Sequence, residues 1–309
     1  MTEKPDAVVT PGNHDGVHLG HRALLEAARA SAGSSASPRR VVVLTFDPHP
    51  LAVLAPERAP ASLTTLARRQ ELLMALGADE VVVRTFDAAF ARLSPEAFVE
   101  GSLVRDLSAR TVVIGPDFRF GRARAGDGGY LRTLGREHGF DVLEVPPVRV
   151  GDETVSSTRI RGLLEDGDVS RADQLLGRPH DVGARVVEGD GRGRTLGFRT
   201  ANLACEPVLL PADGVYAVVV RVGEDAELLH GVANLGVRPT VGAGRSVEVH
   251  LLGVDADLYD RALRVAFVRR LRPERKFDGL EALKAQIAED VGAAQRCLED
   301  ADPSRWRWI

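Results

Sequence analysis

The first half of the sequence alternates apolar, β-branched runs with amphipathic stretches, and this alternation restricts the chain to few folds. The apolar runs lie at 7–10, 41–46, 80–84, 111–115 and 141–145. Apolar residues at helical spacing between them predict helices at 22–30, 63–76, 95–106 and 130–138. Strands that alternate with such helices form a parallel, doubly wound sheet with right-handed crossovers. We therefore predict an α/β doubly wound domain over residues 1–178.

The second half has a different pattern. Short alternating runs, separated by turn residues, lie at 184–188, 215–222, 228–233, 247–252 and 263–268. This spacing predicts a small antiparallel β-barrel domain over residues 183–309, closed by an amphipathic C-terminal helix at about 280–298. A helix is expected near 162–176, and a linker between about 176 and 183.

Charge and composition narrow the class of partner. The 309 residues include 40 Lys and Arg against 44 Asp and Glu, so the net charge of −4 gives no overall field for nucleic acid or an anionic membrane. The two cysteines, Cys205 and Cys297, lack metal-ligand spacing. With no signal peptide and no membrane-spanning apolar run, we expect a cytoplasmic protein. Homo-oligomerisation is left open.

Polar clusters follow four of the predicted strands, at 11–21, 47–50, 115–127 and 155–161. The carboxyl ends of parallel strands meet at one edge of a sheet, which is where such folds bind ligands. The sequence therefore predicts a site built from four converging loops.

The segment 12–21, Gly-Asn-His-Asp-Gly-Val-His-Leu-Gly-His, is the most distinctive of these clusters. His18 and His21 are three residues apart where the loop turns into a helix, so both imidazoles fall beside unpaired backbone N–H groups. Such helix starts bind phosphate, and glycines at 12, 16 and 20 permit close approach of the backbone. Two further interpretations stay open: an inert turn with surface histidines, and a zinc site, for which no third ligand has a diagnostic spacing.

Four motifs of the first half together carry a family resemblance. They are the His-x-Gly-His pattern of nucleotidylyltransferases at 18–21, Thr-Phe-Asp-Pro-His-Pro at 45–50, Gly-Pro-Asp-Phe-Arg-Phe-Gly at 115–121 and Val-Ser-Ser-Thr-Arg-Ile-Arg at 155–161. In this order they resemble the prokaryotic bifunctional riboflavin kinase/FMN adenylyltransferase family, also called FAD synthetase. The resemblance implies that the first domain transfers the adenylyl group of ATP to FMN and releases pyrophosphate.

The resemblance also implies roles for individual residues of this domain. His18 and His21 would be catalytic and hold the ATP phosphates. Further nucleotide and phosphate contacts would come from Gly12, Asp15, Gly16, Gly20, Ser156, Thr158, Arg159 and Arg161. The flavin would lie near Asp47, Pro48, His49, Asp117 and Phe120. Taken without the family, the segment 156–161 is equally consistent with an ordinary helix N-cap followed by arginines.

A second set of motifs resembles the riboflavin kinase module of the same family. The string Gly-Arg-Gly-Arg-Thr-Leu-Gly-Phe-Arg-Thr-Ala-Asn occupies 191–202, and further matches lie at 213–217, 234–240, 247–250 and 271–277. The resemblance implies that Glu248 is the general base for the riboflavin hydroxyl, and that Thr200 and Asn202 hold Mg²⁺, with ATP as co-substrate. It also implies nucleotide contacts from Gly191 and Arg194, and flavin contacts from Arg272 and Phe277. On spacing alone, 200–202 is a polar strand end and Glu248 a solvent-facing residue.

The sequence departs from the family pattern at two motif positions. His14 stands where the family has an aromatic residue, and Arg199 stands where it has proline. Proline fixes φ and lacks an N–H, so arginine alters both the stiffness and the charge of that loop. Three readings follow: a bifunctional enzyme that makes FMN and FAD, a paralogue with a weakened kinase half or altered flavin or nucleotide specificity, and a non-catalytic flavin-binding regulator.

Overall fold

The protein is described by a computed structural model that covers residues 5–34, 39–188, 198–223, 227–237, 245–254 and 258–309. The chain divides into two compact units, 1–156 and 157–309. Each unit is described by itself below. In the described part of the chain, no helix is long and apolar enough to cross a membrane.

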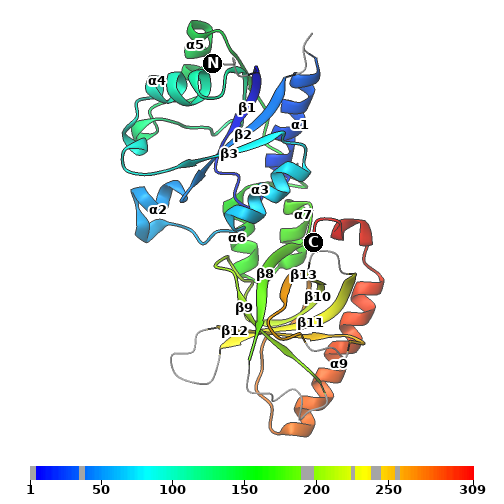
Figure 1. Cartoon of the computed structure of the whole chain (residues 1–309). Coiled ribbons are helices and arrows are strands. Elements are labelled where there is room, and N and C mark those ends of the chain that lie inside the picture. Colours follow the sequence, from blue (N-terminus) through cyan, green and yellow to red (C-terminus); the bar gives the residue numbers. More distant parts are fainter. Residues whose placement is uncertain (1–4, 35–38, 189–197, 224–226, 238–244, 255–257) are drawn as a thin grey trace. The chain divides into compact units, whose positions relative to one another are not determined.

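The first unit is built on a parallel sheet, as the alternating pattern predicts (Figure 1). Its strands are β1 (Ala7–Pro11), β2 (Arg40–Asp47), β3 (Glu80–Thr85), β4 (Ala109–Ile114) and β5 (Asp141–Glu144), in the order β3-β2-β1-β4-β5. The chain runs outward from β1 to β3 and then returns to β4 on the other side of β1. The strand order therefore reverses between β1 and β4, and the loops after these two strands flank the point where such sheets bind ligands.

Helices cover both faces of this sheet. Alternate residues of β1 point to opposite sides, so Val8 packs with Ala28 of α1 (Leu19–Gly33), whereas Ala7 and Val9 join the core beneath α4 (Pro95–Phe98) and α5 (Gly128–His138). After α4 the chain continues as a π-helical segment, Val99–Arg105, where a regular helix over 95–106 was predicted. Short elements complete the unit: α2 (Pro50–Leu54), α3 (Leu66–Ala75), 3₁₀ turns at Pro56–Arg58, Phe90–Arg92 and Arg122–Arg124, and the hairpin β6 (Arg149–Val150) and β7 (Glu153–Thr154).

The second unit contains a closed six-stranded barrel, which confirms the predicted fold class. Its strands are β8 (His180–Val187), β9 (Ala201–Cys205), β10 (Gly214–Val222), β11 (Leu228–Val237), β12 (Arg245–Leu251) and β13 (Ala262–Arg272), in the order β10-β11-β12-β9-β8-β13. Strand β9 was absent from the predicted set. Its single short apolar alternation, at Leu203, does not identify a strand without its neighbours β8 and β12.

Among the described residues of this unit, three α-helices and a 3₁₀ turn at Pro303–Trp306 accompany the barrel. The predicted helix at 162–176 is in fact two, α6 (Ser157–Glu165) and α7 (Val169–Leu176). The break has a local cause: Gly167 adopts a left-handed φ of 79°, and Asp168 caps α7 by accepting a hydrogen bond from the Arg171 N–H at 3.0 Å. The C-terminal helix α9 (Leu280–Glu299) buries Ala294 and Leu298 against the barrel.

Candidate functional sites

The loop that joins β1 to α1 follows an unusual backbone path. His14, Gly16 and Val17 all have positive φ, at 51°, 84° and 44°. Val17 is β-branched, and such residues rarely adopt this conformation, so the surrounding structure must hold the loop in place. Its Gly12 N–H donates to the Leu44 carbonyl of β2 at 2.9 Å, and its Val17 N–H donates to the His14 carbonyl at 3.1 Å.

His18 and His21 cap the start of α1 reciprocally. The backbone N–H of His21 donates to Nδ1 of His18, and the backbone N–H of His18 donates to Nδ1 of His21, both at 3.3 Å. The two rings stack, with their centroids 3.6 Å apart. Because a peptide N–H can only donate, both Nδ1 atoms must be unprotonated acceptors. In their neutral forms the two rings therefore each carry a proton on Nε2, and together they supply two N–H donors at a helix N-terminus.

Two glycines of the loop make room for histidine rings. A Cβ at Gly20 would lie 3.0 Å from Cε1 of His18, and a Cβ at Gly12 would lie 2.9 Å from Cε1 of His14. The Val155 carbonyl oxygen is 3.9 Å from the Cβ position at Gly20, so the end of the first unit reaches the start of α1. The glycines thus set the packing of the imidazoles.

His14 is buried beside this pair, with 1% of its surface exposed. Its Nδ1 lies 2.8 Å from the Gly12 carbonyl oxygen, which can only accept, so His14 has the opposite tautomer to His18 and His21. Its Nε2 has no hydrogen-bond partner among the described residues. Burial lowers the pKa of His14 to about 4, the Gly12 bond opposes this, and the charge of Arg69 adds to it. Burial likewise lowers the pKa of His21, assisted by His18, His14 and Arg69.

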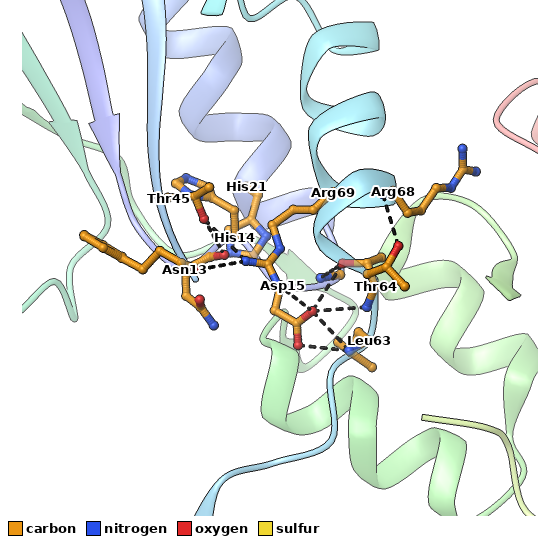
Figure 2. Close-up of polar contacts among 12 residues, drawn as sticks. Asn13, His14, Asp15, His21, Thr45, Leu63, Thr64, Arg68 and Arg69 are labelled. Carbon is orange, nitrogen blue, oxygen red and sulfur yellow. Dashed lines mark hydrogen bonds and ion pairs between the residues drawn. The ribbon is translucent and has the colours of Figure 1, made fainter. Parts of the chain in front are cut away.

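The loop between β1 and α1, residues 12–18, is called the histidine loop below. Asp15 ties this loop to the segment before α3 (Figure 2). Its carboxylate accepts hydrogen bonds from the Leu63 N–H at 3.0 Å and from the N–H and hydroxyl of Thr64, each at 3.2 Å. These bonds explain why α3 begins at Leu66 rather than at 63: Thr65 caps the helix, and the two preceding N–H groups serve Asp15. At 2% exposure, Asp15 holds the loop from within the protein.

The histidine pair is not at the surface, and this excludes one of the sequence interpretations. His18 is 7% exposed, its neighbour His14 is 1% exposed and His21 is half-buried, so the predicted alternative of surface histidines is wrong. Among the described residues, no group of three or more His, Cys, Asp or Glu side chains is placed to hold a metal ion. The arrangement instead offers backbone and imidazole donors, which suit an anion.

The loops after β2 and β4 place the predicted flavin residues. Asp47 and Pro48 are exposed at the end of β2, and His49 caps α2 by accepting from the Leu51 N–H at 3.1 Å. Asp117 is exposed, whereas Phe120 is 6% exposed and stacks on Phe118 with ring centroids 5.5 Å apart. The Phe118 ring is half-buried, so the outer member of this aromatic pair is the one that a ligand can reach.

In the second unit, Thr158, Arg159 and Arg161 occupy the first turns of α6. Thr158 and Arg159 are exposed, and Arg161 is half-buried. Residues three apart lie on the same helix face, so Thr158 and Arg161 share one side of α6.

The barrel brings together the residues predicted for the kinase site. The Thr200 hydroxyl donates to the Glu248 carboxylate at 3.4 Å, and Glu248 of β12 is the register partner of Asn202 in β9. On its other side Glu248 pairs with Asn234 of β11. All four side chains are half-buried. Glu248 is therefore not simply a solvent-facing residue: it lies among hydroxyl and amide groups on one stretch of the barrel wall.

Arg199, which stands where the family has proline, lies next to this cluster. Nδ1 of His250 lies 2.7 Å from the Arg199 carbonyl, to which it donates, and the Phe198 ring meets His250 edge-on at 5.6 Å. His250 is two residues beyond Glu248, so both project from the same face of β12. The contact uses the backbone carbonyl, which proline also has, and the Arg199 side chain is exposed. Gly191 and Arg194 lie outside the described residues.

Arg272 and Phe277 lie near each other after β13. The Arg272 guanidinium makes a paired contact with Asp290 of α9, at 2.8 Å from Nη2 and 3.0 Å from Nε, and it lies 5.5 Å from the Phe277 ring centroid. Arg275 lies over the same ring at 4.8 Å. Two nitrogens of the Arg272 guanidinium, Nε and Nη2, already donate to the Asp290 carboxylate of α9. A flavin contact from Arg272 therefore stays a prediction.

Sequence reasoning missed Arg69, Thr64 and His250 as members of these sites. Arg69 had a detectable signal, because it lies three and four residues before Leu72 and Leu73 and so shares their buried helix face. His250 also had one, since it alternates with Glu248 along a strand. Thr64 had none, because only the folded loop brings it to Asp15.

Together, the parallel sheet with a histidine-capped helix at its switch point and the barrel with a hydroxyl–carboxylate cluster define a two-module protein built to handle phosphate groups. Protein-family models for FAD synthetase and riboflavin kinase match residues 1–159 and 176–298. The chain belongs to the bifunctional riboflavin kinase/FMN adenylyltransferase family, as its motifs predict.

Individual relatives agree with this assignment. The protein named bifunctional riboflavin kinase/FMN adenylyltransferase of Escherichia coli (strain K12) is 43% identical over 284 residues, covering 92% of this chain and 90% of that protein. The Pseudomonas fluorescens protein of the same name is 42% identical over 295 residues, covering 95% and 93%. A crystal structure described as a macrolide-efflux protein from Streptococcus pneumoniae is 30% identical, with a TM-score of 0.85 over 95% of both chains, and shares this fold.

Proposed function

We propose that the protein makes flavin nucleotides in two steps: it phosphorylates riboflavin to FMN with ATP, and it transfers the adenylyl group of a second ATP to FMN, releasing pyrophosphate. The reciprocal cap of His18 and His21 is the observation that carries the adenylyl-transfer step, and the Glu248–Thr200 contact carries the kinase step. Membership of the family supports it, because the relatives named above carry both activities in their names.

Adenylyl transfer needs donors more than it needs a base. The FMN phosphate is already an anionic nucleophile: one of its oxygens bonds to the α-phosphorus of ATP while the bond to the bridging oxygen breaks, and the leaving pyrophosphate takes the negative charge of that bond. His18 and His21 offer two fixed Nε2–H donors beside the free N–H groups of the α1 N-terminus. Ser156, Thr158, Arg159 and Arg161 are proposed to bind the triphosphate and to stabilise the leaving pyrophosphate. Asp15 is better suited to positioning the loop than to contacting phosphate.

The flavin is proposed to reach this site along the loops after β2 and β4. A half-buried Phe118 stacked on Phe120 offers an aromatic face to a flat ring system. Asp47, His49 and Asp117 supply polar side chains at the same carboxyl edge of the sheet, and Pro48 fixes the backbone between the first two. The flavin would thereby bring its phosphate toward the switch point, where the histidines lie.

The kinase reaction is proposed for the Glu248 cluster. Glu248 would accept the proton of the riboflavin 5′-hydroxyl while that oxygen attacks the γ-phosphorus of ATP, and ADP would leave. The hydroxyl of Thr200 and the amide oxygen of Asn202, next to one carboxylate, are the hard oxygen donors that suit Mg²⁺ together with ATP phosphates. Mg²⁺ would supply neutralisation of the phosphate charge. The exposed Arg199 side chain leaves this cluster intact, which favours a retained kinase activity.

The proposal is tested with purified protein, riboflavin, ATP and Mg²⁺, by resolving riboflavin, FMN and FAD chromatographically. FMN and FAD should both accumulate, and FAD should also form from added FMN. FAD from FMN alone would indicate a disabled kinase, and binding without turnover would indicate a regulator. Replacing ATP with CTP or GTP tests nucleotide choice, for which full rates with ATP alone are expected.

A further inference from the structure

Arg69 of α3 places a buried positive charge next to the histidine loop. Its side chain is 5% exposed, and its Nη2 lies 3.9 Å from the Asp15 carboxylate. Its Nη1 lies 3.5 Å from the Thr45 hydroxyl and 3.4 Å from the Phe46 carbonyl, at the end of β2. In turn, the Thr45 hydroxyl donates to the Asn13 carbonyl at 3.0 Å. Arg69 thus joins α3 and the end of β2 to the loop that carries the histidines.

The neighbouring arginine of the same helix makes a useful contrast. Arg68 is equally buried, at 3% exposure, but its guanidinium pairs with Glu71 of its own helix. Figure 2 shows the Arg69 guanidinium among Asn13, His14 and Asp15, whereas the Arg68 side chain points away from them. The two arginines therefore differ in their relation to the histidine loop and hardly at all in burial.

A charge at this place affects the protonation of the imidazoles. The charged and titratable groups that the Arg69 guanidinium acts on are Asp15 and His14 in the loop and His21 at the start of α1. Burial is the main cause of the lowered pKa values of His14 and His21, and the Arg69 charge lowers both further. This matters because a protonated Nδ1 on either capping histidine would face a backbone N–H, donor against donor, and the cap would break.

We propose that Arg69 is a positioning residue for adenylyl transfer: it ties the end of β2 to the histidine loop and keeps His21 neutral, so that His18 and His21 stay mutually capped and present two Nε2–H donors. The proposal rests on the adenylyltransferase function proposed above. Arg69 need not touch a substrate, because it acts through the loop and through His21.

The test compares wild type with Arg69→Gln, Arg69→Lys and the matched control Arg68→Gln. The turnover number for FAD formation from FMN and ATP is measured between pH 5 and 8, together with the KM for ATP. Kinase activity of the same preparation, on riboflavin, reports separately on the second unit. Gln removes the charge but keeps a polar, planar end on a shorter side chain, whereas Lys retains the charge and loses the planar fork.

For Arg69→Gln we expect turnover to fall by about tenfold to a hundredfold, since small misplacements of donors cost this much. The acid limb of its pH profile should move toward neutral pH, because loss of the charge lets His21 take a proton more easily. Arg69→Lys should lose turnover with its acid limb unmoved. Arg68→Gln should match wild type in both respects, and kinase activity should persist throughout.

Wild-type turnover and an unmoved acid limb in Arg69→Gln would overturn the proposal. If Arg69→Gln fails to fold, wild-type turnover in Arg69→Lys would overturn it instead. A shift of the acid limb equal in Arg68→Gln and Arg69→Gln would also contradict it, because the effect would then not depend on the histidine loop. If wild type makes no FAD from FMN, the proposed function fails, which is a distinct result.

Discussion

His18 and His21 accept each other's backbone N–H groups through their Nδ1 atoms, both at 3.3 Å, while their rings stack. Each histidine is thereby both a cap for α1 and a group with a defined tautomer. The same bonds that satisfy two orphan N–H groups of the helix turn the two Nε2–H groups into donors for a ligand. In the proposed function, helix capping and phosphate binding therefore depend on the same two side chains.

Replacement of His21 by alanine is expected to abolish FAD formation and leave riboflavin phosphorylation intact. Loss of one preorganised donor typically costs about 10²- to 10³-fold in turnover, and loss of the cap costs about 0.5–2 kcal/mol of stability. Both products are measured on one preparation. His138→Ala, at the end of α5, is the control and should keep both activities. Equal loss of both activities in His21→Ala would contradict the assignment of His21 to adenylyl transfer.

The buried His14 predicts a pH-dependent stability. Because its pKa is lowered to about 4, the unfolded chain takes up this proton below about pH 6.5 while the folded protein does not. The folded state therefore loses stability as the pH falls, by about 2 kcal/mol between pH 7 and 5 from this residue. The variant His14→Phe has no imidazole at this position, so this loss of stability between pH 7 and 5 should be absent.

Calorimetric melting of wild type and His14→Phe at pH 7 and pH 5 checks this prediction. The melting temperature of the first unit in the variant, relative to wild type, should rise by about 4–8 °C on going from pH 7 to pH 5. Comparing two pH values removes the constant cost of losing the Gly12 hydrogen bond. If the melting temperatures of variant and wild type differ by the same amount at both pH values, His14 is already protonated or well solvated in the folded protein.

Gly20→Ala is expected to slow adenylyl transfer with little loss of stability. Alanine is favoured over glycine inside a helix by about 1 kcal/mol, yet its Cβ would lie 3.0 Å from Cε1 of His18 and must displace that ring. FAD formation and thermal melting are measured together. Gly33→Ala, in the last turn of the same helix, has nothing within 4 Å of its Cβ and is the matched control. Unchanged FAD formation in Gly20→Ala would mean that the ring position of His18 is not critical.

Glu248→Gln is expected to abolish formation of FMN from riboflavin while FAD still forms from added FMN. The amide keeps the shape of the side chain and its contact with Thr200, but it cannot accept the hydroxyl proton. Glu281→Gln, at an exposed carboxylate on α9, should behave as wild type. FMN formation at the wild-type rate in Glu248→Gln would assign the general base to another residue.

Local sequence patterns predicted most of the secondary structure elements of this protein. The β-branched runs predicted all five strands of the parallel sheet, and the spacing of His18 and His21 placed both rings at a helix start. These features depend on residues a few positions apart, whose relation is fixed by the period of a helix or a strand. The break at Gly167 and strand β9 escaped prediction, because one depends on a left-handed glycine and the other on its partners in the barrel.

The sequence by itself determined the two fold classes, the family and the histidine pair, because each is carried by contiguous motifs. Tertiary structure alone decided what the charged residues next to those motifs do. Asp15 lies in a motif predicted to bind phosphate, yet it accepts hydrogen bonds from the backbone of Leu63 and Thr64, which are 48 and 49 residues away. Arg69 resembles Arg68 in sequence, but only Arg69 is turned toward the histidine loop. Burial and long-range hydrogen bonds set these roles, and neither produces a periodic pattern in the amino-acid sequence.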